Sequence, residues 1–593
     1  MKKFGIVLAI CVVIVLGVLC FLIINSEEPY LNTNKVINNG ESPSPSQSSD
    51  LDVINSSSSP SPTATNGNTE GNEDKKDESK QDENINKKVI AKDELGKDVT
   101  GTEYEDGTYV VSGAGEMYNF NLVNGEVCFN KGKEQIVRRD LSNVKKIVIS
   151  NGVKTIGNRS FYDATSMTEI EISDTVTKIG NYAFMNCIKV KNVTVPKGVT
   201  EIGREVFKNC TSLSGVTVAS DVKKIGAYAF EDCSNVTSVI FFEGLKNIGE
   251  YAFKNCSSLM NIYIPSSVDN IGKNAFSGCT SLGEIDVDEN NSAYSSDNGS
   301  LYNKNKSLII KVPQKYSGDF VIPSTVKNIE SYCFECCNDI SSITVPSGVT
   351  VIDDYTFSEC KGIKNIELPD GVTEIRKYAF SNCTSLEKVT LPSTLTKIGG
   401  YAFYECKALT KIRIPTKALD IGEYAFSGCV SLAQLNLPNK MPKLNDYLFS
   451  GCTSLRDISI PENVVEIGKN VFSGCTSLEK INFPAKLRTV GDAAFFGCSS
   501  LSGLDIEYGV EKIGTHVFEN CTKVRRVNVP ESVKQIGYGT FNGCTKLERV
   551  VFKNRANTIS DVNIESYGND WLKGFRGELV GNDYIYMKSY VSQ

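Results

Sequence analysis

Apolar residues recur along this chain at a fixed interval, and a phenylalanine marks each period of 23 residues. The series is Phe161, Phe184, Phe207, Phe230, Phe253 and Phe276, and after one interruption Phe334, Phe357, Phe380, Phe403, Phe426, Phe449, Phe472, Phe495, Phe518 and Phe541. A period of this length is typical of a solenoid, in which each unit buries its apolar face only against its neighbours. Such arrays usually act by presenting a long surface.

Each unit follows the pattern V-x-x-I-G-x-Y-A-F-x-x-C-x-x-L-x-x-I-x-I-P. The L-x-x-I-x-I segment alternates apolar and polar positions, which predicts a half-buried strand. Proline follows this strand in most copies and ends its pairing, because it has no N–H to donate. The glycine after Ile, as in Gly180, Gly203 and Gly226, predicts a turn with positive φ. The A-F-x-x-C segment suits a single helical or 3₁₀ turn.

These residues resemble the BspA-type leucine-rich repeats of bacterial surface proteins, whose unit is similar to I-G-x-x-A-F-x-x-C-x-x-L-x-x-I-x-I-P. Residues 179–196, 421–438 and 467–484 match that unit closely, and the resemblance covers about 151–552. It implies a leucine-rich-repeat solenoid, a right-handed coil with a parallel β-sheet face, short helical or 3₁₀ turns and a cap at each end. It also implies adhesion, with an extracellular macromolecule as the ligand.

The expected organisation has five parts. Residues 1–25 form a membrane anchor or signal peptide, 26–98 a disordered linker, 99–150 an N-terminal β cap, 151–552 the solenoid and 553–593 a C-terminal cap. Within the solenoid, the spacing from Phe276 to Phe334 indicates an insertion at 288–316. Its segment 300–313 predicts a hairpin around Asn303–Lys306 that projects from the array and could line a binding face.

The N-terminal segment Phe4–Ile24 is uncharged and long enough to span a bilayer, with Lys2 and Lys3 before it. We expect an uncleaved single-pass anchor with the C-terminal region outside the cell, and secretion after signal cleavage is the alternative. Residues 31–103 contain no aromatic residue. The first part of this segment is rich in Ser, Pro and Asn, and the second part is rich in charged residues. Such a segment cannot bury enough apolar surface to fold, so it predicts a tether.

Most of the 20 cysteines lie three residues after a repeat phenylalanine, where the first repeat has Ala164. A position that accepts Ala or Cys favours a buried, reduced thiol over a disulfide. The single histidine, His516, occupies a position that is Tyr in nine other copies, which is typical of a structural substitution. Asp286, Asp288 and Asn290 alternate as in a calcium loop, but the loop lacks the turn glycine and the final glutamate.

These patterns predict neither a catalytic nor a cofactor nor a metal site, and the net charge of −7 argues against a nucleic-acid ligand. We therefore expect a monomeric, non-enzymatic binding protein. The candidate ligand-binding face consists of outward strand positions, which vary while their inward neighbours do not: Lys388, Thr390, Lys411, Arg413, Gln434, Asn436, Asp457 and Lys480.

Two functions remain open: adhesion to host or neighbouring-cell macromolecules, and a structural role in the cell envelope through binding of glycan or another envelope protein. A stripe of six tyrosines, from Tyr332 to Tyr447, favours stacking between repeats over a ligand platform.

Overall fold

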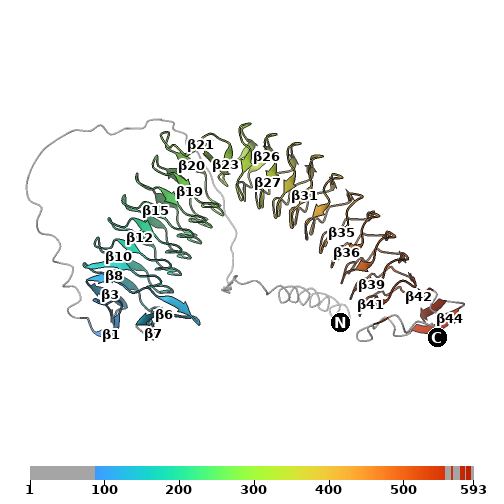
Figure 1. The fold of residues 1–593 in the computed structure, drawn as a ribbon, viewed down its shortest axis with the longest axis horizontal. Coiled ribbons are helices and arrows are strands. Elements are labelled where there is room, and N and C mark those ends of the chain that lie inside the picture. The colour runs from blue at the N-terminus through green and yellow to red at the C-terminus, as the bar shows by residue number, and fades with distance from the viewer. Residues whose placement is uncertain (1–86, 132, 554–562, 565–574, 581–582, 589–593) are drawn as a thin grey trace, which may run out of the picture. The chain divides into compact units, whose positions relative to one another are not determined.

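The computed structural model describes residues 87–131, 133–553, 563–564, 575–580 and 583–588, all within the unit Gln81–Gln593. The predicted anchor at 4–24 and the linker up to residue 86 lie outside this part of the chain. None of the described residues belongs to a helix long and apolar enough to cross a membrane. The described chain is a β-solenoid whose successive coils stack along the array (Figure 1).

The L-x-x-I-x-I segments form the strands of one side of the coil, which we call the strand face. Its strands are β8 (Lys146–Ile149), β10 (Glu169–Ile172), β12 (Asn192–Thr194), β14 (Gly215–Thr217), β16 (Ser238–Ile240), β18 (Asn261–Ile264), β20 (Glu284–Val287), β24 (Gly318–Val321), β26 (Ile340–Thr344), β28 (Asn365–Glu367), β30 (Lys388–Thr390), β32 (Lys411–Arg413), β34 (Gln434–Asn436), β38 (Leu504–Asp505), β40 (Arg526–Val529) and β42 (Arg549–Phe552). Neighbouring strands pair in parallel, and equivalent residues face each other, as Val193 faces Val216. The parallel sheet predicted from the alternating pattern is confirmed.

A second set of short parallel strands, the second ladder, precedes the glycine of each repeat. Its members are β9 (Val153–Ile156), β11 (Lys178–Ile179), β13 (Glu201–Ile202), β15 (Lys224–Ile225), β17 (Asn247–Ile248), β19 (Asn270–Ile271), β25 (Asn328–Ile329), β27 (Val351–Ile352), β29 (Glu374–Ile375), β31 (Lys397–Ile398), β33 (Asp420–Ile421), β35 (Lys443–Leu444), β36 (Glu466–Ile467), β37 (Thr489–Val490), β39 (Lys512–Ile513), β41 (Gln535–Ile536) and β43 (Asn563–Ile564). The last residue of most of these strands is buried and lies above its counterpart in the coil before, as Ile248 does above Ile225.

The repeat phenylalanines form the centre of the core. Phe403, which is fully buried, has its ring centroid 5.1 Å from that of Phe380 and 5.4 Å from that of Phe426, with the planes within 1° of parallel. Similar stacking runs from Phe161 to Phe276 and from Phe334 to Phe541. One ring per coil therefore fills the interior, and each ring covers its two neighbours.

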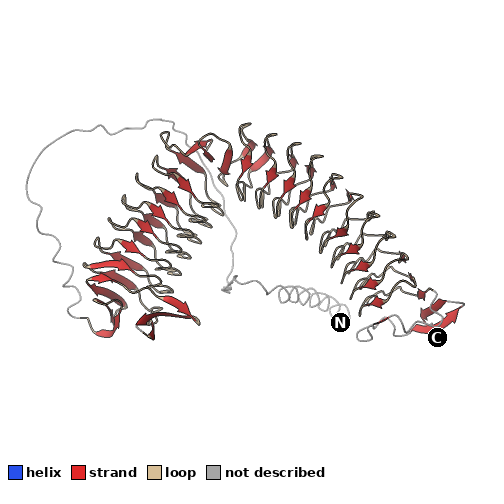
Figure 2. Ribbon diagram, viewed as in Figure 1, coloured by secondary structure: helices blue, strands red, loops and turns tan. Residues whose placement is uncertain are grey.

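The A-F-x-x-C segment forms linked turns and no helical or 3₁₀ element, although alternate N–H groups bond within the coil, as Glu231 donates to Tyr228 O at 3.2 Å. Among the described residues the structure contains strands, turns and loops and no helix (Figure 2). In the coil around Phe230, the N–H groups of Tyr228, Phe230 and Asp232 donate to the next coil, to Glu250, Ala252 and Lys254, at 2.8–2.9 Å. Tyr228 and Asp232 have φ values of 59° and 63°. Because residues such as Tyr228 and Asp232 have a left-handed conformation, alternate N–H groups of the segment point toward the next coil. In a helix the same groups would donate to carbonyls of their own segment.

This arrangement, which we call the turn ladder, has a direction. Its inter-coil N–H groups point toward the C-terminal coil and the accepting carbonyls toward the N-terminal one. The first coil of a stack consequently presents carbonyls without a preceding donor. Arg138 supplies donors at the start of the array, to Ser160 O at 2.8 Å and Tyr162 O at 2.7 Å.

The glycine after Ile does not have the positive φ that the sequence suggested: Gly180, Gly203 and Gly226 are absent from the left-handed region. The reason for glycine is close packing between coils. A Cβ on Gly226 would lie 2.6 Å from the carbonyl carbon of Gly203. The positive φ instead falls two residues later, at Tyr182, Glu205 and Tyr228.

The described cysteines are free thiols, which confirms the reduced interpretation of the repeat position. The repeat thiols also donate to the phenylalanine carbonyl of the preceding coil, as Cys406 Sγ does to Phe380 O at 3.1 Å. Cys337, which follows the insertion, donates to Val312 O and Pro313 O instead. The first repeat has no preceding repeat phenylalanine, so Ala164 suffices there. Burial raises the thiol pKa, to about 12 for Cys383, which keeps these groups protonated and unreactive.

The array begins with a set of mostly antiparallel strands: β1 (Val89–Glu94), β2 (Val99–Tyr104), β3 (Thr108–Gly113), β4 (Gly115–Glu116), β5 (Asn121–Val123), β6 (Glu126–Lys131) and β7 (Glu134–Val137). Strand β3 pairs in parallel with β8 and so covers the first edge of the strand face. The boundary placed at residue 98 was wrong, because β1 lies inside the range expected to be linker. Its pairing with β2 supplies the backbone partners that a linker would lack.

The insertion contains β21 (Tyr294–Asp297), β22 (Ser300–Asn303) and β23 (Leu308–Lys311). Strands β22 and β23 form the predicted antiparallel hairpin. It does not project from the array as expected, because β23 pairs in parallel with β25 and takes a place in the second ladder. Tyr302 and Ile309 are buried at 2% and 0% exposure, so their apolar surface holds the hairpin in the stack.

The insertion divides the core. Leu301 ends one buried cluster and Tyr302 begins the next. Polar side chains lie where the insertion interrupts the turn ladder. Glu335 accepts the N–H of Gly278 at 3.0 Å, and the buried Lys311 donates to Tyr332 O at 2.9 Å. A carboxylate thus faces the donor end of the interrupted ladder, as acidic groups do at a helix N-terminus.

Glu335 should make the junction sensitive to pH. Burial raises the pKa of its carboxyl above the ordinary 4.5, although the charge of Lys311 opposes this. The folded chain then binds the proton more tightly than the unfolded chain, so this group adds stability as pH falls from neutrality toward 4.5. We expect Glu335→Gln to remove that gain while keeping an acceptor for Gly278. Denaturant unfolding of both proteins at pH 7 and pH 5 checks it, and an equal pH dependence of the two would contradict it.

At the C-terminal end, β42 pairs antiparallel with β45 (Asp583–Lys588), which pairs with β44 (Phe575–Val580). An antiparallel hairpin therefore occupies the last edge of the strand face. The remainder of the predicted cap at 553–593 lies outside the described residues, apart from β43 and Lys553.

Candidate binding face

All eight predicted face residues are exposed. Lys388 and Thr390 lie on β30, Lys411 and Arg413 on β32, and Gln434 and Asn436 on β34, while Asp457 and Lys480 lie on later coils. The exposure follows from the strand pleat, because the residues between them, such as Val389 and Ile412, point inward and are at most 5% exposed.

Six of these residues line one open groove of about 830 Å³ across β30, β32 and β34. Asp457 and Lys480 do not line it. Sequence reasoning missed the aliphatic part of the lining, which includes Leu391, Leu435 and Pro415, all partly exposed. Leu391 and Leu435 occupy inward repeat positions that are buried in neighbouring coils, so the alternation of the sequence does not identify them.

No carboxylate of the described residues lies directly opposite the three groove cations in the strand register; the acidic Glu367 of β28 faces Thr390 instead. Lys388 and Lys411 are register partners on adjacent strands, about 4.8 Å apart at the backbone. Lys388 otherwise faces Asn365, and Arg413 faces Asn436. None of the three takes part in an ion pair with the described residues. Like charges directly opposite each other on a sheet are destabilising, so this arrangement is costly unless an anion offsets it.

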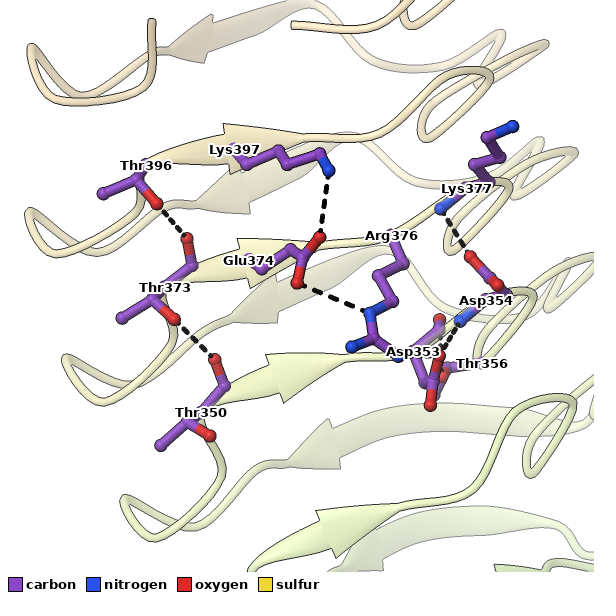
Figure 3. A network of polar contacts seen from close by, with 10 residues as sticks. All are labelled: Thr350, Asp353, Asp354, Thr356, Thr373, Glu374, Arg376, Lys377, Thr396 and Lys397. Atoms are coloured by element: carbon purple, nitrogen blue, oxygen red, sulfur yellow. Dashed lines mark hydrogen bonds and ion pairs between the residues drawn. The ribbon is translucent and has the colours of Figure 1, made fainter. Parts of the chain in front are cut away.

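The second ladder shows the opposite organisation of charge. Lys397 bridges to Glu374 at 3.3 Å and faces Asp420 on its other side, and Lys443 faces Glu466. Figure 3 shows this compensated region. In the same region Arg376, which stands where most repeats have glycine, pairs with Asp353 at 2.9 Å. Charges of opposite sign therefore alternate along the second ladder, whereas the groove gathers cations of one sign.

A smaller hollow of about 380 Å³ lies over the second ladder where Gly399, Gly400 and Gly422 leave space. Its rim carries both acidic and basic side chains, several of them already paired, as between Glu374 and Lys397. Its described lining carries four acidic and three basic side chains, so their charges nearly cancel. The strand-face groove is the stronger candidate.

The other residues considered from the sequence have structural partners. His516 Nδ1 contacts Glu519, and its ring packs edge-on against Tyr538. Asp288 accepts from Tyr263 Oη at 2.7 Å and from the N–H of Asn290 at 2.8 Å. The loop that resembles a calcium site thus bonds to the protein's own donors.

The tyrosine stripe is a stack of rings. Neighbouring centroids from Tyr332 to Tyr447 lie 4.3–4.6 Å apart with planes within 13° of parallel. Because each ring covers the face of the next, mainly ring edges and hydroxyls remain for solvent. This confirms the packing role expected for these residues.

Comparison with known families decides the classification. The BspA type leucine rich repeat region matches residues 139–223, 200–317, 316–429, 373–500 and 465–567. The chain belongs to the BspA-type leucine-rich repeat family. Members of this family are typically bacterial cell-surface proteins, and leucine-rich-repeat proteins generally act as binding scaffolds rather than enzymes.

The chain is also similar to solved structures. A leucine-rich repeat protein from Eubacterium ventriosum is 27% identical with a TM-score of 0.52, covering 66% of this chain and 96% of that one. One from Bacteroides ovatus is 24% identical with a TM-score of 0.38, covering 77% and 94%. The pneumococcal vaccine antigen PcpA is 19% identical with a TM-score of 0.41, covering 68% and 93%. No curated protein sequence matches this chain.

Proposed function

We propose that this chain is a membrane-tethered extracellular binding protein that adheres to a host or neighbouring-cell macromolecule through the strand face. The observation that carries the proposal is the uncompensated cluster of Lys388, Lys411 and Arg413 in a groove with aliphatic walls. Exposed groups of this kind contribute little to folding, so their arrangement is better explained by a ligand than by stability.

The rest of the chain fits this role. The apolar segment Phe4–Ile24 would hold the protein at the membrane, and the polar linker that follows would place the solenoid away from it. As a coil of about 70 residues, the linker would separate its ends by roughly 45 Å. The protein would act as a monomer with no cofactor, and its ligand would be an extracellular protein or glycan rather than nucleic acid.

Charge reversal of the groove tests the proposal. The variant Lys388→Glu/Lys411→Glu/Arg413→Glu should reduce capture of intact host matrix by about tenfold or more, because it replaces attraction by repulsion. Stability should change little, since these side chains are exposed. Capture is measured by surface binding of the purified full chain, and unfolding by denaturant titration.

The matched control reverses three exposed lysines of the second ladder, Lys178, Lys443 and Lys512, which form no ion pair within the described chain. It changes the net charge equally and should leave capture intact. Equal losses in both variants would contradict a site in the groove. Binding to isolated peptidoglycan instead of host matrix would favour a structural role in the envelope.

A further inference from the structure

The spacing of the groove cations narrows the class of ligand. Lys411 and Arg413 are two residues apart on β32, so their Cα atoms lie about 6.7 Å apart and their side chains leave the same side of the strand. An extended peptide repeats its side chains on one side at the same interval. If such a peptide lay along β32, carboxylates at two alternate positions could pair with Lys411 and Arg413. Lys388 on the adjacent strand would lie beside the carboxylate that pairs with Lys411.

The remaining lining also suits a peptide. Thr390, Gln434 and Asn436 supply hydroxyl and amide groups, which can bond to a peptide backbone. Leu391, Leu435 and Pro415 supply partly exposed aliphatic surface for an apolar side chain. The lining contains no aromatic ring on which a sugar could stack, which disfavours a glycan.

We propose that the groove across β30, β32 and β34 binds an extended acidic segment of a protein partner, with Asp or Glu at alternate positions and an aliphatic residue beside them. This inference rests on the proposed function, since it names the ligand class of the same groove. Lys411 and Arg413 would pair with the two carboxylates, and Lys388 would contact the first of them beside Lys411; such pairs fix orientation and register.

Fluorescence anisotropy with defined peptides tests the inference. The probe is a fluorescein-labelled twelve-residue peptide that alternates Asp with Leu and Ser, and the comparison peptides carry Asn or Lys in place of Asp. The full chain should bind the Asp peptide at least about tenfold more tightly than the Asn peptide, and more weakly as salt rises. The Lys388→Glu/Lys411→Glu/Arg413→Glu variant should lose the Asp peptide and gain the Lys peptide.

The gain of the Lys peptide is the informative outcome, because a variant that simply misfolds cannot show it. The second-ladder control with Lys178, Lys443 and Lys512 reversed should behave as the unchanged protein. Equal binding of the Asp and Asn peptides would overturn the inference. A second set of results would also overturn it: the unchanged protein binds heparin, a sulfated glycan, tightly but does not bind the Asp peptide, and the groove variant no longer binds heparin.

Failure of the inference is distinguishable from failure of the proposed function. If the groove variant no longer captures host matrix but the unchanged protein does not bind the Asp peptide, the groove is a binding site for another ligand. If the groove variant captures matrix normally, the site lies elsewhere and both proposals fall.

Discussion

Replacing Phe403 with alanine should lower the free energy of unfolding by about 3–5 kcal/mol, the usual cost of removing a buried aromatic ring. The ring is fully buried and stacked between Phe380 and Phe426, so its loss leaves a cavity that two neighbouring coils line. Neither coil can close the gap without shifting the hydrogen-bonded ladders on either side. Denaturant unfolding followed by circular dichroism measures the difference.

Cys406→Ala in the same coil is the control. It removes one sulfur and a weak hydrogen bond to Phe380 O, and the first repeat already carries Ala164 at the equivalent position. We expect it to cost about 1 kcal/mol. Equal losses from the two substitutions, or unfolding of the array by reductant alone, would contradict the description of the core.

Excision of one whole coil should leave the fold intact, whereas excision of half a coil should disrupt it. Removing residues 400–422 joins Gly399 to Glu423 and preserves the 23-residue period, so Phe426 would stack on Phe380. Removing residues 400–411 leaves a segment too short to circle the core and deletes both Phe403 and Cys406. Because coils interact with nearest neighbours, the second change loses packing on both sides and should cost at least about 5 kcal/mol.

Thermal unfolding of the two deletions, with the unchanged chain alongside, decides between these outcomes. The in-register deletion should unfold cooperatively within several degrees of the unchanged protein. Similar destabilisation by both deletions would show that the coils are not interchangeable units.

The repeat period and strand alternation were sufficient to predict the solenoid, because burying one phenylalanine per coil leaves few alternatives. The same pattern left the A-F-x-x-C segment incompletely described, since the sequence does not show that its N–H groups bond alternately within a coil and between coils. It also misassigned Gly226, whose constraint comes from the backbone of the adjacent coil. The insertion was located correctly, but its buried Tyr302 could not be recognised before its partners were known.

The candidate face was predictable in part. Alternation along a strand identifies outward residues such as Lys411 and Arg413, because the pleat fixes their side. It does not identify which coils open into a groove, so Asp457 and Lys480 were grouped with residues whose groove they do not line. The period of 23 residues already places Lys388 and Lys411 at equivalent positions of adjacent coils, and the parallel register of β30 and β32 makes them direct neighbours.

Capture of host matrix by coil-deleted proteins tests the central claim most directly. Excising residues 400–422 removes β32, with Lys411 and Arg413, and keeps the repeat in register. Excising residues 204–226 removes an equivalent coil from a distant part of the array by joining Gly203 to Ala227. The account predicts that the first protein loses capture and the second retains it, with both folded by circular dichroism. Capture by the first protein at the level of the unchanged chain would contradict a binding site on this part of the strand face.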